Sequence, residues 1–172
     1  KPKKIAFIQC VGSREIEAQY CSSVCCMYAT KEAVIMKEHE PDTDCTIFYI
    51  DLRAFGKGFE AYYNRAKELG VKYIRCRPSS VKEDPFTQNL MLQYQEESSG
   101  ITTAEFDLVV LATGLKPGSD SPEIAKLFNI NLDEHGFAST KEFSPSESSN
   151  PGVYVAGVLS GPKDIPESVM EA

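Results

Sequence analysis

Short apolar runs rich in β-forming residues alternate along this chain with longer stretches in which apolar residues recur at helical spacing. The short runs predict strands that are buried on both faces, as in a parallel sheet. These runs are residues 4–8, 45–50, 71–76 and 108–112. The longer stretches, residues 24–39 and 59–69, predict helices, and Gly70 is placed to end the second of them. Alternation of this kind is typical of an α/β domain with a parallel central sheet.

The stretch between the third and fourth of these strands has a different pattern. Runs at residues 81–83 and 90–94 flank a turn at residues 84–85, and a further turn follows at residues 98–100. We expect these runs to form a small antiparallel β meander attached to the parallel sheet.

The last third of the chain is richer in turn residues. Residues 123–128 predict a short helix, and residues 151–157 predict a last strand. Between them, residues 144–150 are polar, and we expect this segment to be mobile.

Cysteines occupy the connection where a dinucleotide-binding fold carries its phosphate loop. That loop has the pattern G-x-G-x-x-G between the first strand and the first helix, and here only Gly12 is present. Without the glycines there is no pyrophosphate site, although Asp51 at the end of the second strand is an acid of the kind that binds a ribose. We therefore expect Asp51 to pair with Arg53 or to cap its loop.

Four of the six cysteines lie in this stretch, and they are Cys10, Cys21, Cys25 and Cys26. Cys21 and Cys25 are four residues apart, so they share one face of a helix, while Cys10 comes from the end of the strand. Thiolates are favoured at a helix N-terminus because its N–H groups are unpaired and carry partial positive charge. An iron–sulfur cluster is anionic and suits the same place.

Spacing alone leaves the chemistry of these cysteines open. The pattern C-x10-C-x3-C-C is neither that of common ferredoxins nor that of structural zinc sites. The alternatives are small buried core residues, a dithiol or vicinal disulfide at Cys25 and Cys26, and a structural zinc ion. Cys45 and Cys76 each stand alone in or beside a predicted strand, and we expect them to be core residues.

Composition and charge exclude several classes of function. The chain is 42% hydrophobic and 25% charged, as in soluble globular proteins, and its net charge of -7 argues against nucleic-acid binding. No apolar run approaches the roughly 20 residues of a membrane span, so we expect no membrane insertion. Six cysteines without a regular framework fit a reducing compartment, which favours a cytoplasmic location.

Four motifs together resemble one family. They are FIQCVGSR from residue 7, YCSSVCCMYATKEA from residue 20, FGKGFE from residue 55 and GPKDIPE from residue 161. In combination they resemble the A subunit of heterodisulfide reductase, and they are similar to the flavoprotein subunits of quinone-interacting membrane-bound oxidoreductases. The resemblance covers essentially the whole chain.

This resemblance implies a fold and a domain organisation. Residues 1–114 would form a Rossmann-like three-layer domain, as in the NAD(P)H-binding domain of thioredoxin-reductase-like flavoproteins, inserted into a larger core. Residues 115–172 would return the chain toward an FAD domain. We therefore expect the chain to be a fragment of a longer iron–sulfur flavoprotein.

The resemblance also implies cofactors and roles for particular residues. It implies that Cys10, Cys21, Cys25 and Cys26 ligate a [4Fe–4S] cluster. It further implies that Gly157, Lys163, Asp164 and Ile165 border an FAD held mostly outside this chain, although Val158 replaces the acid of the flavoprotein motif G-V-Y-x-A-G-D. The fragment is then expected to bind little or no FAD and to be inactive by itself.

The implied function is electron transfer between FAD and the cluster, with other iron–sulfur subunits of a redox complex as partners. No Ser/His/Asp or Cys/His arrangement suggests a catalytic residue. A dithiol/disulfide redox domain and a degenerate NAD(P)H-binding domain remain the alternatives.

Overall fold

A computed structural model describes residues 1–96 and 100–172 of the chain. The chain divides into two compact units. The first unit consists of Lys1–Val11 and Cys25–Thr113, and the second consists of Gly12–Val24 and Gly114–Ala172.

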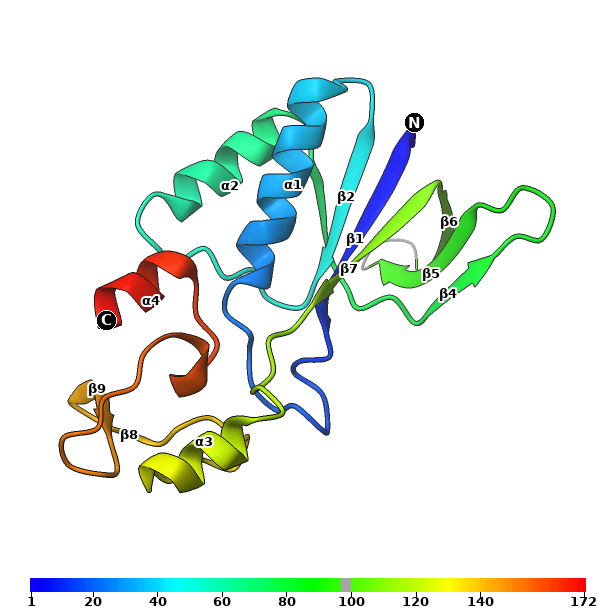
Figure 1. Cartoon of the computed structure of the whole chain (residues 1–172). Coiled ribbons are helices and arrows are strands. Elements are labelled where there is room, and N and C mark those ends of the chain that lie inside the picture. Colours follow the sequence, from blue (N-terminus) through cyan, green and yellow to red (C-terminus); the bar gives the residue numbers. More distant parts are fainter. Residues whose placement is uncertain (97–99) are drawn as a thin grey trace. The chain divides into compact units, whose positions relative to one another are not determined.

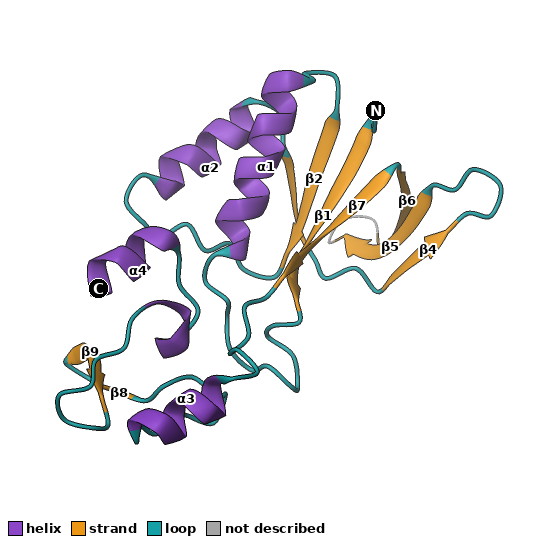
Figure 2. Cartoon of the chain, viewed as in Figure 1, coloured by secondary structure: helices purple, strands orange, loops and turns teal. Residues whose placement is uncertain are grey.

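A parallel sheet of four strands, in the order β3-β2-β1-β7, is the centre of the first unit (Figures 1 and 2). The strands are β1 (Lys4–Val11), β2 (Asp44–Tyr49), β3 (Lys72–Arg75) and β7 (Leu108–Thr113). β1 pairs in parallel with β2 on one side and with β7 on the other. Its residues from Ile5 to Ile8 are apolar and buried, as expected for a strand whose sheet is covered on each face.

Helices cover one face of this sheet and an antiparallel sheet covers the other (Figure 2). The helices are α1 (Cys25–His39) and α2 (Phe59–Glu68), and the antiparallel strands are β4 (Ser80–Glu83), β5 (Leu90–Glu96) and β6 (Gly100–Phe106). Ile5 and Phe7 of β1 pack with the apolar side of α1, whereas Ala6 and Ile8 pack with Leu92 and its neighbours on β5 and β6. The expected three-layer α/β fold with a parallel sheet and a β meander is confirmed; the turn expected at residues 98–99 lies outside the described residues.

The segment Gly12–Val24 connects β1 to α1 but packs with the second unit. The Tyr20 hydroxyl donates a hydrogen bond to the Leu115 carbonyl at 2.9 Å, and the Leu115 N–H donates to the Ser22 hydroxyl at 2.9 Å. The Tyr20 ring also makes an edge contact with Phe137. These contacts hold the segment Gly12–Val24 against the residues that follow β7, Leu115 and Phe137 among them.

The second unit contains short elements around a small core. They are α3 (Ser121–Phe128), β8 (Thr140–Lys141), β9 (Ser144–Ser148), a 3-10 helix (Gly157–Ser160) and α4 (Ile165–Glu171). Ala125, Ile130, Ala138 and Val155 form its buried cluster. No helix in residues 1–96 and 100–172 has the length and apolar character needed to cross a membrane.

Two expectations for the second unit are wrong. Residues 144–150 contain β9, which pairs with β8. Residues 151–157 are not a strand, and Tyr154 makes only an isolated bridge to Glu147. The reason is that Gly152 and Gly157 both have positive φ, at 84° and 67°, which breaks the extended backbone on each side of the apolar run.

Asp107 ties the start of β7 to the start of β1. Its carboxylate accepts hydrogen bonds from the backbone N–H groups of Lys3 at 2.5 Å and Lys4 at 2.9 Å. These two bonds, the Lys3 bond first, lower the pKa of the Asp107 carboxyl below its ordinary value of 3.8. The charged form is therefore the one that stabilises the fold.

Replacing Asp107 with alanine should lower the free energy of unfolding by on the order of 1 kcal/mol at pH 7, a modest figure because the side chain is exposed. The stabilisation should be fully present above the ordinary carboxyl pKa and should be lost as the pH falls through the lowered folded pKa. Thermal unfolding of both proteins at a series of pH values checks this. Asp42→Ala is the control, since the exposed Asp42 carboxylate makes no hydrogen bond within the described residues. Equal losses for the two variants at pH 7 would contradict the prediction.

Candidate functional site

β1 is irregular at its carboxyl end, where the cysteine stretch begins. Ile8 pairs with Leu111 and Val11 pairs with Thr113, so β1 advances three residues while β7 advances two. The extra residue makes a β-bulge, and Cys10 takes a φ of 60°, which residues other than glycine rarely adopt. At this bulge the backbone of Cys10 lies near enough to the Cys25 sulfur to lower the pKa of the Cys25 thiol. The bulge thus directs β1 toward the first turn of α1.

Cys25 and Cys26 begin α1 and are both buried. The pKa of the Cys25 thiol is lowered to about 6, first by a hydrogen bond from the Cys26 thiol and further by the backbone N–H groups of Cys10, Cys25 and Cys26. Burial acts in the opposite direction. The same bond to Cys25, together with burial, raises the pKa of the Cys26 thiol. The first turn of the helix therefore stabilises negative charge on sulfur, as expected for a helix N-terminus.

Cys21 belongs to the connection between β1 and α1. It is half-buried, and its sulfur accepts a hydrogen bond from the Ser23 N–H at 3.4 Å. The structure thus brings Cys10, Cys25 and Cys26 together in the first unit, while Cys21 lies in the segment assigned to the second. Within residues 1–96 and 100–172, no group of three or more His, Cys, Asp or Glu side chains is arranged to hold a metal ion. The ligand set of four cysteines stays a prediction.

Asp51 pairs with Arg75 of β3, and its expected pairing with Arg53 stays a prediction. Its carboxylate accepts a hydrogen bond from the Arg75 guanidinium at 3.2 Å, and Arg75 also donates to the Ile50 carbonyl at 3.0 Å. The reason is the register of the parallel sheet, in which Tyr49 of β2 lies opposite Arg75 of β3. The backbone of Arg53 acts to lower the pKa of the Cys26 thiol, against the larger effects that raise it. The acid that a dinucleotide site would use for ribose is thus engaged in an ion pair.

Two residues near the thiols carried no clear functional signal in the sequence analysis. Gln9 is buried beside Cys10 in β1, and a polar residue that interrupts an apolar strand was the signal that could have identified it. Tyr73 of β3 forms a hydrogen bond with Thr30 of α1 at 3.1 Å. Burial is the main cause that raises the pKa of Tyr73 to about 12, and the hydrogen bond with Thr30 acts in the opposite direction.

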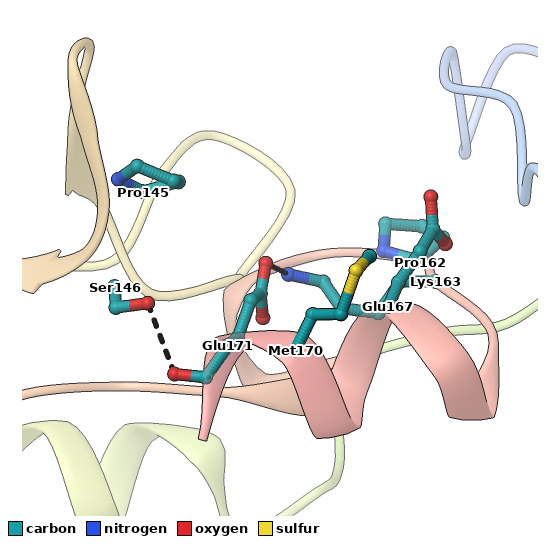
Figure 3. A pocket seen from close by; sticks show the side chains of 7 residues that line it. All are labelled: Pro145, Ser146, Pro162, Lys163, Glu167, Met170 and Glu171. Atoms are coloured by element: carbon teal, nitrogen blue, oxygen red, sulfur yellow. Dashed lines mark hydrogen bonds and ion pairs between the residues drawn. The ribbon is translucent and has the colours of Figure 1, made fainter.

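The four residues expected at the flavin lie in the second unit, in or between the 3-10 helix and the first turn of α4. Figure 3 shows one of them, Lys163, beside Glu171 of α4. The Lys163 ammonium pairs with the Glu171 carboxylate and donates to the Ser160 hydroxyl at 2.6 Å. Gly157 donates its backbone N–H to the Glu171 carboxylate at 3.1 Å. A hollow of about 440 Å³ adjoins this pair, and its lining consists of Pro145, Ser146, Pro162, Lys163, Glu167, Met170 and Glu171.

Asp164 and Ile165 form the start of α4. The Asp164 carboxylate accepts the Glu167 N–H at 2.8 Å while the Glu167 carboxylate accepts the Asp164 N–H at 2.9 Å, which is a capping box. The Ile165 side chain is 79% exposed. These contacts give Asp164 a structural task, and a role at a flavin stays a prediction for all four residues.

Known proteins match this chain along nearly its whole length. No family model matches it. The iron–sulfur A subunit of the CoB–CoM heterodisulfide reductase of Methanocaldococcus jannaschii is 45% identical, and the match covers 99% of this chain and 27% of that protein. The A subunit of the H2:CoB–CoM heterodisulfide,ferredoxin reductase of Methanothermobacter thermautotrophicus is 43% identical, with 100% and 27% covered. An Archaeoglobus profundus protein named for its likeness to the A subunit of heterodisulfide reductase is 38% identical, with 100% and 25% covered.

Solved structures of flavoproteins share the fold. Thioredoxin reductase from Lactococcus lactis matches with a TM-score of 0.61 at 21% identity, covering 98% of this chain and 48% of that one. LpdA from Mycobacterium tuberculosis matches with a TM-score of 0.59 at 13% identity, covering 99% and 33%. The architecture is therefore that of thioredoxin-reductase-like flavoproteins.

The sequence relatives are much longer than this chain, which spans 25% to 27% of the three described above. The identity of 38% to 45% nevertheless extends from end to end of the chain. The chain belongs to the family of heterodisulfide reductase A subunits.

Proposed function

We propose that this chain is an electron-transfer domain in which Cys10, Cys21, Cys25 and Cys26 hold a [4Fe–4S] cluster. The cluster would exchange single electrons with an FAD that is held mostly outside the chain. The observation that carries the proposal is the meeting of buried thiols and backbone N–H groups at the end of β1 and the start of α1. The name of the Methanocaldococcus jannaschii relative, which calls it an iron–sulfur protein, supports the same chemistry.

The chemistry of the donor set, four cysteines, supports an iron–sulfur cluster. None of the six cysteines forms a disulfide, so thiols are available as ligands. Cys10, Cys25 and Cys26 are at most 2% exposed, and a thiolate buried to this extent needs a positive counterpart. Iron supplies that counterpart, and thiolates are its usual ligands in clusters of this kind.

The residues around the thiols have definite tasks in such a site. The N–H groups of Cys10, Cys25 and Cys26 direct hydrogen bonds at the Cys25 sulfur and so favour its charged form. The Arg53 N–H does the same for the Cys26 sulfur. Burial between sheet and helix excludes water, which together with hydrogen bonds to sulfur adjusts the reduction potential. The cluster, when bound, supplies one-electron chemistry, and no acid or base in the chain needs to move a proton for it.

The flavin side of the proposal rests on Gly157, Lys163, Asp164 and Ile165. Lys163 is held by Glu171, and the exposed Ile165 side chain is available for contact with another part of a longer protein. The names of the relatives describe components of heterodisulfide reductases. We therefore propose that the domain works within a cytoplasmic redox complex whose other iron–sulfur subunits are its partners.

Anaerobic reconstitution of the chain with iron and sulfide should yield about four irons per chain. Cys25→Ala should lose most of this iron because it removes a central thiolate ligand. Iron and acid-labile sulfide analysis, with an electron paramagnetic resonance spectrum after dithionite reduction, measures the result. Cys45→Ala is the matched control, since Cys45 is a buried thiol of the β2 core. Wild-type protein without iron after reconstitution, or equal iron in both variants, would contradict the proposal.

Cys21 offers a separate test of the ligand set. It is half-buried, and Cys76, which is not a proposed ligand, is half-buried too and serves as the comparison. In the metal-free, reduced chain a maleimide should label both of these thiols. After reconstitution Cys21 should be protected at least tenfold in labelling rate, whereas Cys76 should react as before. Mass spectrometry of the labelled peptides follows each site, and unchanged labelling of Cys21 in iron-loaded protein would remove it from the ligand set.

A dithiol redox centre is the second candidate, and the adjacency of the buried Cys25 and Cys26 thiols at the start of α1 favours it. In that reaction the two thiols would become a disulfide and pass two electrons and two protons to a disulfide substrate. Stoichiometric oxidation of this pair in protein that takes up no iron would support the dithiol function over the cluster.

A further inference from the structure

Gln9 has a buried side chain without a hydrogen-bond partner. The residue is 2% exposed, and within the described chain neither the amide nitrogen nor the amide oxygen has a partner. The large majority of buried side-chain polar atoms in proteins are paired, because desolvation without a new hydrogen bond costs free energy. An amide in this state is available to a group that the protein binds.

The position of Gln9 in β1 shows which layer it faces. Ile5 and Phe7 belong to the core cluster that includes α1, whereas Ala6 and Ile8 belong to the cluster formed with the antiparallel sheet. Side chains alternate along a strand, so Gln9 shares the face of Ile5 and Phe7. Its amide therefore lies on the side of β1 that α1 covers, at the carboxyl end of the strand.

The cysteines are at that same end. Cys10 follows Gln9 directly, and Cys25 and Cys26, both buried, form the first turn of α1, where the backbone of Cys10 is near enough to lower the pKa of the Cys25 thiol. An amide group supplies two N–H donors, and sulfur that carries negative charge is an acceptor for them. The partner that Gln9 lacks is thus of the kind that a cluster at these cysteines would supply.

We propose that Gln9 donates an amide hydrogen bond to a sulfur atom of the iron–sulfur cluster, either a sulfide or a cysteine thiolate, and thereby raises its reduction potential. The inference rests on the proposed function. Reduction adds negative charge to the cluster, so a donor stabilises the reduced form more than the oxidised form. Gln9 is then a residue that adjusts the potential, in addition to the four thiolate ligands.

The first experiment compares Gln9→Met with the wild type after anaerobic reconstitution. Methionine is similar in length and flexibility but has no N–H donor. The variant should bind the same amount of iron. Its one-electron reduction constant should fall about tenfold, which is a midpoint potential about 59 mV more negative. A mediated redox titration followed by electron paramagnetic resonance measures this shift.

The matched control is Gln95→Met, which makes the same change on the exposed side of β5. Its midpoint potential should equal that of the wild type. A shift of similar size in both variants would overturn the inference, because the effect would then not depend on the position of Gln9.

A second measurement separates this role from a structural one. In the metal-free chain, Gln9→Met should melt at the same temperature as the wild type or higher, because an apolar side chain replaces an unpaired buried amide. If Gln9 were needed for folding, metal-free Gln9→Met would melt at a lower temperature than the wild type. That result would overturn the inference.

The outcomes distinguish this inference from the proposed function. If the wild type and Gln9→Met both bind iron and have the same midpoint potential, the role of Gln9 is overturned and the cluster stays in place. Wild-type protein that takes up no iron would overturn both. Equal iron content with a more negative potential in Gln9→Met alone supports both.

Discussion

Burial of β1 on both faces and along both edges organises the first unit. The strand lies between β2 and β7, and residues from Ile5 to Cys10 are at most 8% exposed. A strand in this position pairs its backbone with two neighbours and places side chains alternately in two apolar layers. The apolar residues of β1 satisfy this constraint as far as Ile8. Gln9 and Cys10 end the apolar run at the bulge, so the change from core to site takes place within one strand.

The site occupies the place that a dinucleotide fold reserves for phosphates. In that fold, glycines allow the backbone N–H groups at a helix start to approach a pyrophosphate. Here the backbone N–H groups of Cys25 and Cys26, at the start of α1, help to lower the pKa of the Cys25 thiol. The electrostatic principle is unchanged, since a helix N-terminus favours an anion, but the anion is a thiolate of the chain itself. The ion pair of Asp51 with Arg75 is consistent with this change, because it engages the acid that a ribose would need.

Local contacts hold the last helix of the second unit. Asp164 and Glu167 cap α4, and Lys163 pairs with Glu171 within the same short segment. The cluster of Ala125, Ile130, Ala138 and Val155 is small, and several large apolar side chains near the end of the chain are exposed, Ile165 and Met170 among them. Exposed apolar surface of this kind often marks an interaction site. The relatives are about four times as long as the segment that this chain matches.

The sequence by itself determined the main strands and helices of the first unit, the antiparallel meander and the stretch that carries the cysteines. Apolar periodicity is a local property, and each of these elements has a long enough run of it. The replacement of phosphate-loop glycines by cysteines was also visible there, and the resemblance to the heterodisulfide reductase family followed from contiguous motifs.

Only the tertiary structure decided how distant residues meet. The bulge at Cys10 arises from the register of β1 against β7, and the pairing of Asp51 with Arg75 arises from the register of β2 against β3. The strand expected at residues 151–157 does not form because positive φ at its two glycines outweighs its apolar pattern. The unpaired amide of Gln9 could not be predicted either, because burial and hydrogen bonding of one side chain depend on every element packed around it.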